Sequence, residues 1–318
     1  MSERTLIELQ GVTKDYGKGK GVFDLSFSVE KGEVFGYLGP NGAGKTTTIR
    51  QLMGFIRPEQ GKCQIAGWDC FTQAEKIQRI TGYLAGELSF PEDMTGMGFL
   101  KLMAELKGIR DLKIMRELME RFELDPHGKI GRMSKGMKQK IGIVNAFMHE
   151  PKLVILDEPT SGLDPLMQNR FVELILEEKQ KGTTVLMSSH MFEEVEKTCD
   201  RTAVIRQGRI AAIEDRKTLA GKRKKIYQTV LKDQEAVRRF LAEPGIEALQ
   251  YHCMDGKVSP APNQTEWTIA ENRSLAEALR ILAKYEPQSL ETRVQSLEEL
   301  FFQYYEKGGE EHDLSSTV

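Results

Sequence analysis

The residues with the clearest chemical potential form a glycine-rich segment near position 40, which reads GPNGAGKT. It fits the pattern G-x-x-x-x-G-K-[ST], in which glycines let successive backbone N–H groups turn inward around phosphate oxygens. The pattern assigns Lys45 to the outer phosphates and the Thr46 hydroxyl to Mg²⁺. A helix that begins near Lys45 adds its positive end. The nucleotide-binding residues predicted here are Gly39, Pro40, Asn41, Gly42, Ala43, Gly44, Lys45, Thr46 and Thr47.

Two neighbouring carboxylates, Asp157 and Glu158, follow the apolar run LVIL. Side chains at the carboxyl end of a parallel strand face the crevice where ligands bind. Asp157 is therefore predicted to hold Mg²⁺, directly or through water, and Glu158 to polarise the water that attacks the γ-phosphate. Taken alone, two acids after a strand are more often simply the solvated end of that strand.

The elements around these residues alternate between strand and helix. Glu33–Leu38 is predicted as a strand that runs into the glycine-rich segment, and Thr46–Phe55 as the helix after it. The runs LVILD and TTVLMSS predict buried strands of a parallel sheet with a helix between them. Arg201–Ile213 is predicted as one strand that closes this region. From about 88 to 146, apolar residues recur three or four apart, which predicts helices.

Further motifs narrow the family. Met133–Lys140 (MSKGMKQK) resembles the signature of ABC ATPases, and Leu156–Pro165 (LDEPTSGLDP) resembles their Walker B motif and D-loop. Ser188-Ser189-His190 resembles their switch-histidine loop, and Tyr16 matches the aromatic residue that stacks on adenine. The order and spacing of these motifs fit the family from about residue 5 to residue 215.

This resemblance implies ATP as the ligand and a head-to-tail dimer. Each ATP would lie between the glycine-rich segment of one subunit and the signature of the other. Ser134 and the Gly136 N–H would contact the γ-phosphate from a helix N-terminus. The signature residues predicted to contact ATP in the second subunit are Ser134, Lys135, Gly136 and Met137.

Two further residues receive roles from the resemblance. His190 would contact the γ-phosphate from the same subunit as Glu158, and these two residues are the predicted catalytic pair. Without the surrounding motifs, His190 would be interpreted as a buried histidine bonded to backbone groups. Asp164 of the D-loop would cross the dimer interface. The predicted metal ligands are Thr46 and Asp157.

The sequence departs from the family pattern at two places. The signature has Lys135 and Met137 where glycine and glutamine are usual, a variant that resembles the antibiotic- and multidrug-export branch. The Q-loop reads GYLAGE, so Gly86 stands where a glutamine would ligate Mg²⁺. Glu87 is one position out of register. The alternatives are that Glu87 reaches the metal or that a water takes the place of the glutamine.

The expected fold class is α/β. It comprises a P-loop (RecA-like) parallel-sheet core with an antiparallel β subdomain and a helical subdomain, plus a small α+β C-terminal domain. The expected ranges are 1–220 for the ATPase domain, with its helical part at about 88–146, 221–307 for the accessory domain and 308–318 for a disordered tail. The basic stretch Gly221–Lys225 is predicted as a linker, or alternatively as a contact with anionic lipid.

Composition restricts the remaining possibilities. The chain has 318 residues with a net charge of −2, which favours no nucleic-acid partner. Its apolar runs fall short of the ~20 residues of a membrane span, and its start lacks a signal-peptide pattern. We therefore expect a cytoplasmic location. Four cysteines without zinc-site spacing predict reduced thiols.

The predicted function is an ATP-binding and ATP-hydrolysing subunit that powers export through a separate membrane permease. The expected partners are a second copy of the subunit and transmembrane permease subunits, which would attach at the inner face of the cell membrane. The docking surface is predicted near Gly86–Asp93 and the helix at 98–108, where Phe90 and Met94 either contact the permease or fill the core. The alternatives are a soluble ABC-type ATPase acting on a ribosome or nucleic acid, and a P-loop GTPase or small-molecule kinase. The transported substrate is not predicted.

Overall fold

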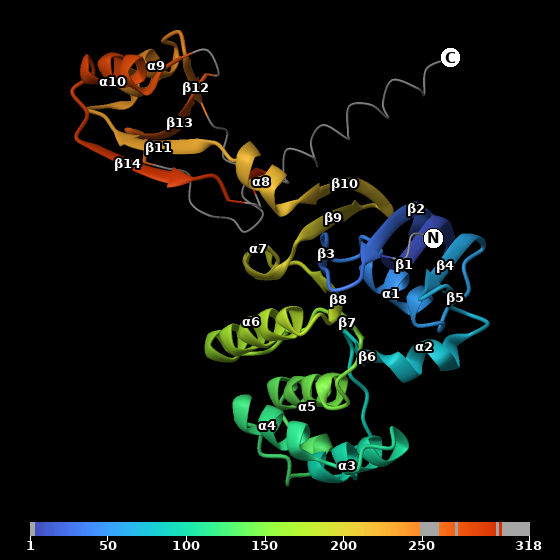
Figure 1. Ribbon diagram of the computed structural model, residues 1–318. Coiled ribbons are helices and arrows are strands. Elements are labelled where there is room, and N and C mark those ends of the chain that lie inside the picture. Colours follow the sequence, from blue (N-terminus) through green and yellow to red (C-terminus); the bar gives the residue numbers. More distant parts are fainter. Residues whose placement is uncertain (1–3, 249–260, 271–272, 297–298, 301–318) are drawn as a thin grey trace. The chain divides into compact units, whose positions relative to one another are not determined.

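The computed structural model describes residues 4–248, 261–270, 273–296 and 299–300 (Figure 1). These residues divide into two compact units, with the boundary between Thr218 and Leu219. Each unit has its own hydrophobic core.

A six-stranded sheet forms the centre of the first unit, in the order β10-β9-β3-β8-β7-β6. Neighbouring strands are parallel, except that β10 is antiparallel to β9. β3, β7 and β8 are buried along their whole length, which matches the continuous apolar runs of their sequences. The strands of this sheet are β3 (Val34–Leu38), β6 (Thr81–Leu84), β7 (Leu153–Asp157), β8 (Thr184–Ser189), β9 (Arg201–Arg206) and β10 (Arg209–Asp215).

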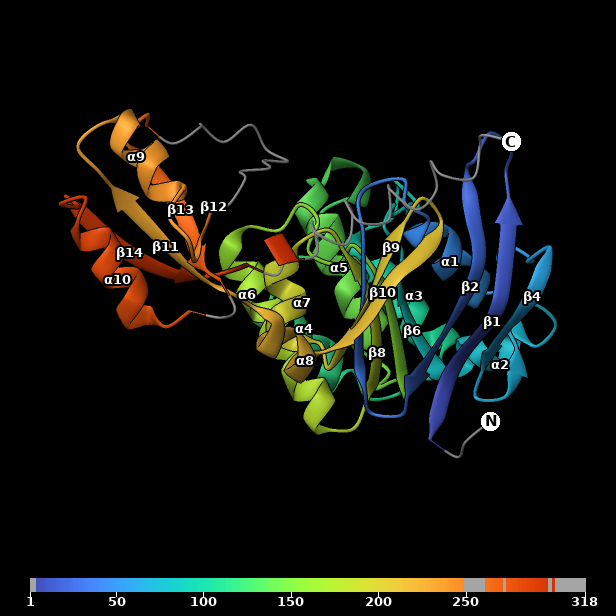
Figure 2. The ribbon, with the colours of Figure 1, turned by 90° about the horizontal axis from the view of Figure 1, so that it is seen from above.

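An antiparallel sheet, in the order β2-β1-β4-β5, packs against the parallel one. The two sheets share a core in which Phe27 of β2 stacks on Phe35 of β3, with 5.4 Å between ring centroids. Figure 2 shows the antiparallel sheet, in blue, beside the central strands. Its strands are β1 (Thr5–Asp15), β2 (Gly21–Glu30), β4 (Gln60–Ile65) and β5 (Trp68–Asp69). The expected α/β class with an antiparallel subdomain is confirmed.

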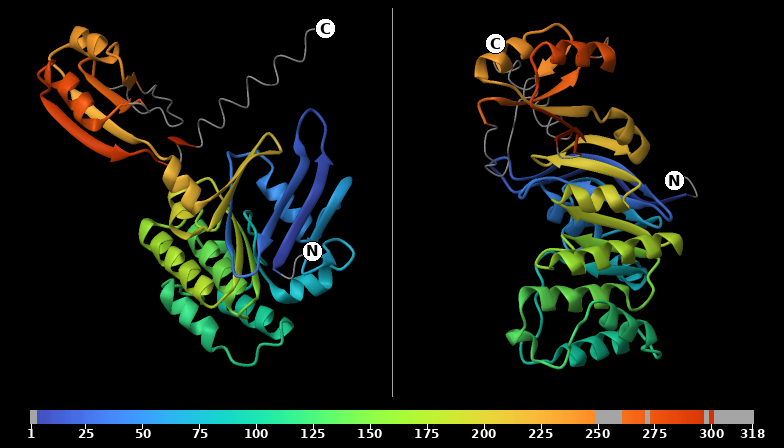
Figure 3. Two further views of the ribbon diagram at one scale, coloured as in Figure 1. Left: turned by 45° about the horizontal axis from the view of Figure 1, so that its top comes forward. Right: turned by 90° about the vertical axis from the view of Figure 1, so that its left-hand side faces the viewer.

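The helices α3, α4 and α5 lie together at one end of this unit (Figure 3), and α5 packs on β6. Helices α3, α5 and α6 begin at side-chain caps, which are Thr95, Ser134 and Asp164. The helices are α1 (Lys45–Leu52), α2 (Ala74–Ile80), α3 (Gly96–Leu106), α4 (Lys113–Arg121), η1 (Ile130–Arg132), α5 (Lys135–Phe147), α6 (Pro165–Gln180) and α7 (Phe192–Thr198).

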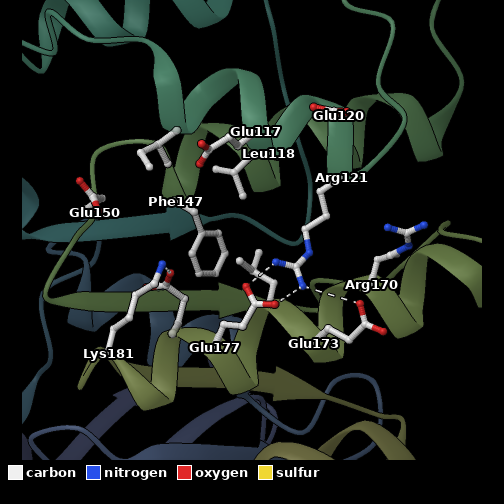
Figure 4. Close-up of a pocket in the computed structure, with 13 residues that line it drawn as sticks. Glu117, Leu118, Glu120, Arg121, Phe147, Glu150, Arg170, Glu173, Glu177 and Lys181 are labelled. Carbon is white, nitrogen blue, oxygen red and sulfur yellow. Dashed lines mark hydrogen bonds and ion pairs between the residues drawn. The ribbon is translucent and has the colours of Figure 1, made fainter.

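A groove of about 430 Å³ separates α4 from α6 (Figure 4). Arg121 of α4 spans it and forms two bonds with Glu177 of α6, at 2.6 and 2.8 Å, while Glu173 lies 3.7 Å away. The guanidinium holds the pKa of the Glu177 carboxyl below its usual range. This bridge ties the helical end to the parallel-sheet core.

The second unit contains a four-stranded antiparallel sheet in the order β12-β13-β11-β14. The chain order β-α-β-β-α-β with this strand order is the split β-α-β arrangement, and α9 and α10 cover one face (Figure 1). Trp267 is fully buried between Tyr227 and Phe240, and its indole N–H donates to Thr229 at 3.1 Å. The elements are α8 (Arg216–Lys222), β11 (Lys225–Val230), α9 (Gln234–Leu241), β12 (Ile246–Ala248), β13 (Gln264–Ile269), α10 (Leu275–Ala283) and β14 (Ser289–Val294).

The structure corrects one local expectation, the single strand at Arg201–Ile213, and adds detail at two other places. Arg201–Ile213 is a hairpin and not one strand, because Gln207 and Gly208 both adopt positive φ and form its turn. The expected linker Gly221–Lys225 is mostly ordered, since α8 continues to Lys222 and β11 begins at Lys225. The sequence analysis assigned no strand to Ser289–Val294, which is β14.

Some expectations fall outside the described residues. They concern the tail 308–318, Cys253, and the aromatic residues Phe301, Phe302, Tyr304 and Tyr305, for which the sequence favours core packing over contact with a partner. The other cysteines, Cys63, Cys70 and Cys199, are buried free thiols. None of the described helices is long and apolar enough to cross a membrane.

A lysine and a histidine meet between the end of α3 and the end of α5. The Lys107 Nζ lies 3.0 Å from Nε2 and 3.2 Å from Nδ1 of His149. Burial lowers the pKa of His149 to about 4, and the Lys107 ammonium adds to this shift. Burial also lowers the pKa of Lys107, to about 8. The imidazole is therefore neutral in the folded protein over most of the acidic range.

The lowered pKa of His149 predicts acid sensitivity. The unfolded chain binds a proton near pH 6.5, while the folded chain resists it until about pH 4. The contribution of His149 to the free energy of unfolding is therefore complete above pH 6.5 and is lost as the pH falls toward 4. His149→Gln should flatten the fall in melting temperature between pH 7 and pH 4.5, whereas the exposed control His127→Gln should not. Identical pH profiles for wild type and His149→Gln would contradict this assignment.

Candidate functional site

The glycine-rich segment forms a tight loop between β3 and α1. A Cβ on Gly39 would lie 2.4 Å from the Ile205 carbonyl oxygen, so only glycine fits there. Gly44 has φ 111° and caps α1, with the backbone of Gly21 beside it. The Lys45 ammonium donates to the Gly39 carbonyl at 2.6 Å, and its side chain is 5% exposed. The loop therefore encloses a buried cation at the start of a helix.

Asp157 ends β7 with both carboxylate oxygens engaged. Thr46 donates to Oδ2 at 2.7 Å, and Ser188 donates to Oδ1 at 2.6 Å. The carboxylate is fully buried, so these two hydroxyls provide the hydrogen bonds that its burial requires. The parallel register places Ser188 of β8 directly beside Asp157, and the structure thereby brings the predicted metal pair Thr46 and Asp157 together.

Glu158 lies between two predicted site residues. Its Oε1 is 3.0 Å from the Lys45 ammonium, and its Oε2 is hydrogen-bonded to Nδ1 of His190. The residue has φ 51°, a left-handed conformation that is uncommon outside glycine. Its backbone N–H donates to the Ser188 hydroxyl at 3.1 Å, which holds this conformation. The two predicted catalytic residues therefore touch each other and the phosphate-loop lysine.

The signature residues begin α5. Ser134 is exposed, and its hydroxyl accepts the Met137 N–H at 3.2 Å. Lys135 donates to the Ser161 hydroxyl at 2.8 Å, so its charge is directed at the loop after β7 in the same subunit. A Cβ on Gly136 would lie 2.6 Å from the Gly162 carbonyl oxygen, which requires glycine there.

Two other predicted residues are exposed on the surface. Asp164 caps α6 by accepting the Met167 N–H at 3.0 Å. Tyr16 is 52% exposed on the turn between β1 and β2, with the Lys14 ammonium 5.4 Å from its ring centroid. Gly21, at the end of this turn, lies against Gly44 of the phosphate loop. These exposed side chains are available to a ligand or to a second subunit.

The sequence analysis missed two buried polar residues. Gln139 of α5 donates to the carbonyl groups of Pro159, at 2.7 Å, and Glu158, at 3.3 Å. Glu194 of α7 accepts the Ser189 hydroxyl at 3.2 Å, and burial raises its pKa. The sequence does contain a signal for Gln139, because this polar residue lies on the apolar face of an amphipathic helix. Gln139 holds the signature helix α5 to the backbone of Glu158 and Pro159.

Gly86 lies directly against the metal-site carboxylate. A Cβ at this position would be 3.0 Å from Oδ2 of Asp157. Glu87, the alternative metal ligand considered from the sequence, is exposed. The residue that replaces the usual glutamine thus brings its backbone close to Asp157, where a Cβ would contact the carboxylate tightly.

Comparison with known proteins agrees with this geometry. The family model for ABC transporters matches residues 22–161. The bacitracin transport ATP-binding protein BcrA of Bacillus licheniformis is 38% identical over 209 residues, which are 65% of this chain and 68% of that protein. An uncharacterized ABC transporter ATP-binding protein of Bacillus subtilis, YcbN, is 30% identical over 302 residues, which are 93% of this chain and 95% of that protein.

Solved structures show the same fold. An ATP-binding subunit of an ABC transporter has a TM-score of 0.63 at 32% identity and covers 69% of this chain and 93% of its own. A dimeric ATP-binding cassette bound to ADP and Pi has a TM-score of 0.61 at 21% identity and covers 66% and 99%. The fold and the site together define a nucleotide-binding cassette of the ATP-hydrolysing class. The chain belongs to the ABC transporter family, as one of its ATP-binding subunits.

The contact between Gly86 and Asp157 generates a prediction. Gly86→Ala should displace the Asp157 carboxylate and lower ATP hydrolysis by roughly tenfold or more, because small shifts of catalytic groups are costly. Gly128→Ala is the matched control, since its Cβ would meet Met133 at an ordinary 3.7 Å. ATPase assays over a range of Mg²⁺ concentrations measure the effect. A wild-type rate for Gly86→Ala would show that the site tolerates a side chain there.

Proposed function

We propose that the protein binds ATP with Mg²⁺, hydrolyses it in a head-to-tail dimer of two copies, and powers export of a substrate through a separate membrane permease. The observation that carries the proposal is the contact of Glu158 with both Lys45 and His190. These three residues meet at the end of β7. Lys45 would bind phosphate, Glu158 would polarise the attacking water, and His190 would contact the γ-phosphate.

The Lys45–Glu158 ion pair supplies a mechanism for coupling binding to hydrolysis. A triphosphate in the loop competes for the Lys45 ammonium, because phosphate oxygens attract it more strongly than one carboxylate does. Glu158 is then released to accept a hydrogen bond from the attacking water. His190 keeps hold of the other Glu158 oxygen and orients the carboxylate.

The oxygen atoms near Asp157 suit Mg²⁺, which prefers hydroxyl and carboxylate ligands. Thr46 Oγ1 and Asp157 Oδ2, which now bond to each other, would hold the ion. Bound there, Mg²⁺ neutralises charge on the phosphates. Ser188 retains the other oxygen of Asp157 and so fixes the direction of the carboxylate.

Exposed helix N-termini on a single subunit support the proposed dimer. Ser134 and Asp164 cap helices whose N-termini are open to solvent. A helix N-terminus with free backbone N–H groups attracts phosphate, so Ser134–Met137 of one copy would complete the site of the other. Tyr16 would stack on the adenine. One solved cassette of the same fold is described as a dimer with ADP and Pi.

The permease partner and the export direction rest on two observations. One relative is named as a bacitracin transport protein, and the Lys135 signature variant resembles the export branch. On α3, Leu102 and Leu106 are 39% and 72% exposed, one turn apart, and α3 also carries Phe99, which packs edge-on against Phe90 at 4.9 Å. This apolar helix face would dock the permease. The subunit would then work in the cytoplasm, at the inner face of the membrane, with 221–307 as an accessory domain.

Two substitutions separate binding from hydrolysis. Lys45→Ala removes the cation from the loop, so ATP binding should weaken. Glu158→Gln keeps the shape of the side chain but removes its charge, so ATP should bind while hydrolysis falls by ~10²-fold or more. The Glu158→Gln variant should accumulate as an ATP-bound dimer in size-exclusion chromatography with Mg²⁺.

The control is Glu193→Gln, a highly exposed glutamate on α7 that pairs only loosely with Lys197 at 3.9 Å. It should keep the wild-type hydrolysis rate and elute as wild type does under the same conditions. If Glu158→Gln hydrolyses ATP as fast as wild type, the role assigned to Glu158 is wrong.

A further inference from the structure

The outer edge of β14 has the properties of an interface. β14 ends the sheet of the second unit and pairs with β11 on one side only, and no other described strand pairs with it. Leu290 and Val294 on this strand are 39% and 58% exposed. An open edge is often protected by a proline, a bulge or charged side chains. SLETRV has no proline and no bulge, and its two charges, Glu291 and Arg293, have opposite signs.

The hydrogen-bonding direction of β14 follows from its register. The Gln295 N–H donates to the Lys224 carbonyl just beyond β11, and Val294 pairs with Lys225. In an antiparallel pair, alternate residues bond to the neighbour. The odd-numbered residues of β14 therefore face β11, and Leu290, Thr292 and Val294 turn their N–H and C=O groups outward.

The sequence of β14 is complementary to itself about Thr292. A two-fold axis there places Leu290 opposite the partner's Val294 and Glu291 opposite the partner's Arg293. Apolar pairs then form on one face, and on the other Glu291 faces the partner's Arg293, which is already bonded to Glu266 and Glu299 of its own chain. Opposite charges across strands are stabilising. Moving the axis to either neighbouring residue would place Glu291 or Arg293 opposite its own copy, with like charges in contact.

Helix α10 also carries exposed apolar residues. α9 packs on β12 and β13, which leaves α10 over the half of the sheet formed by β11 and β14 (Figure 1). On α10, Leu275 and Leu279 are 45% and 37% exposed, one turn apart. Leu290 and Val294 lie on the sheet face that the helices cover, because they alternate with Arg293, whose guanidinium bonds to Glu266 on the opposite face.

We propose that β14 and α10 form a two-fold interface with a second copy of this chain, by antiparallel pairing of β14 centred on Thr292. This self-complementarity favours a second copy of the chain as the partner, because a two-fold contact uses the same surface on both partners. A strand from another protein would not need β14 to match itself in this way. The interface requires no nucleotide and so goes beyond the ATP-dependent dimer. It would hold two subunits at a high effective concentration between rounds of hydrolysis.

Disulfide trapping tests the register in the full chain. Thr292→Cys, in a Cys253→Ser background, should crosslink to a covalent dimer on mild oxidation without nucleotide, since the two Cα atoms would be about 5.5 Å apart. Glu291→Cys is the matched control, because its two copies would be about 8 Å apart, too far for a disulfide. We expect at least ~tenfold faster crosslinking at 292 than at 291. Equal rates, or no crosslink at 292, would overturn the proposal.

A second variant separates this interface from the ATP-dependent one. Val294→Lys places a charge on an exposed edge residue, so it should keep the melting temperature but remain monomeric in sedimentation without ATP. In a Glu158→Gln background, the same variant should still dimerise with ATP and Mg²⁺. If Val294→Lys dimerises without ATP as wild type does, the β14 interface is wrong. If Glu158→Gln alone shows no additional dimerisation with ATP and Mg²⁺, the proposed function is contradicted instead.

Discussion

The placement of two adjacent carboxylates at the end of the buried strand β7 is the constraint on which the rest of the site depends. Neighbouring acids repel, and buried charges need partners. Asp157 is satisfied by the hydroxyls of Thr46 and Ser188, and Glu158 by Lys45 and His190. These partners come from α1, from β8 and from the residue after β8. The parallel register that sets Ser188 beside Asp157 therefore organises the whole site.

The signature helix is attached to the same loop. Gln139 donates to the carbonyl groups of Glu158 and Pro159, and Lys135 donates to Ser161. Gly136 lies against Gly162 without space for a side chain. Because interiors are close-packed, a displacement of α5 must be transmitted to the backbone of Glu158. This connection gives a physical route between events at the helical end and the catalytic carboxylate.

The phosphate loop and the parallel core were predictable because their signals are local. The glycines of the loop and the apolar strand before it have one good structural explanation, whereas the acids after LVIL are specific only together with the motifs around them. The strand β14 was missed because its alternation of Leu290, Thr292 and Val294 with charged residues is short. It also lies between two segments, 274–285 and 296–306, whose apolar spacing predicts helices. The turn at Gln207 was missed because a glutamine with positive φ leaves no signal in the sequence. The role of Gln139 becomes visible only through its hydrogen bonds to the carbonyl groups of Glu158 and Pro159, in the loop after β7.

In the proposed dimer, each nucleotide site needs residues from two subunits. The most direct test mixes a Lys45→Ala chain with a Ser134→Arg chain, each of which should be inactive alone. In a mixed dimer, one site carries both defects, and the other keeps an intact Lys45 and an intact Ser134. Random pairing makes half of the dimers mixed, so the account predicts ATP hydrolysis of about a quarter of the wild-type rate. A mixture that forms mixed dimers yet stays as inactive as its components would contradict it.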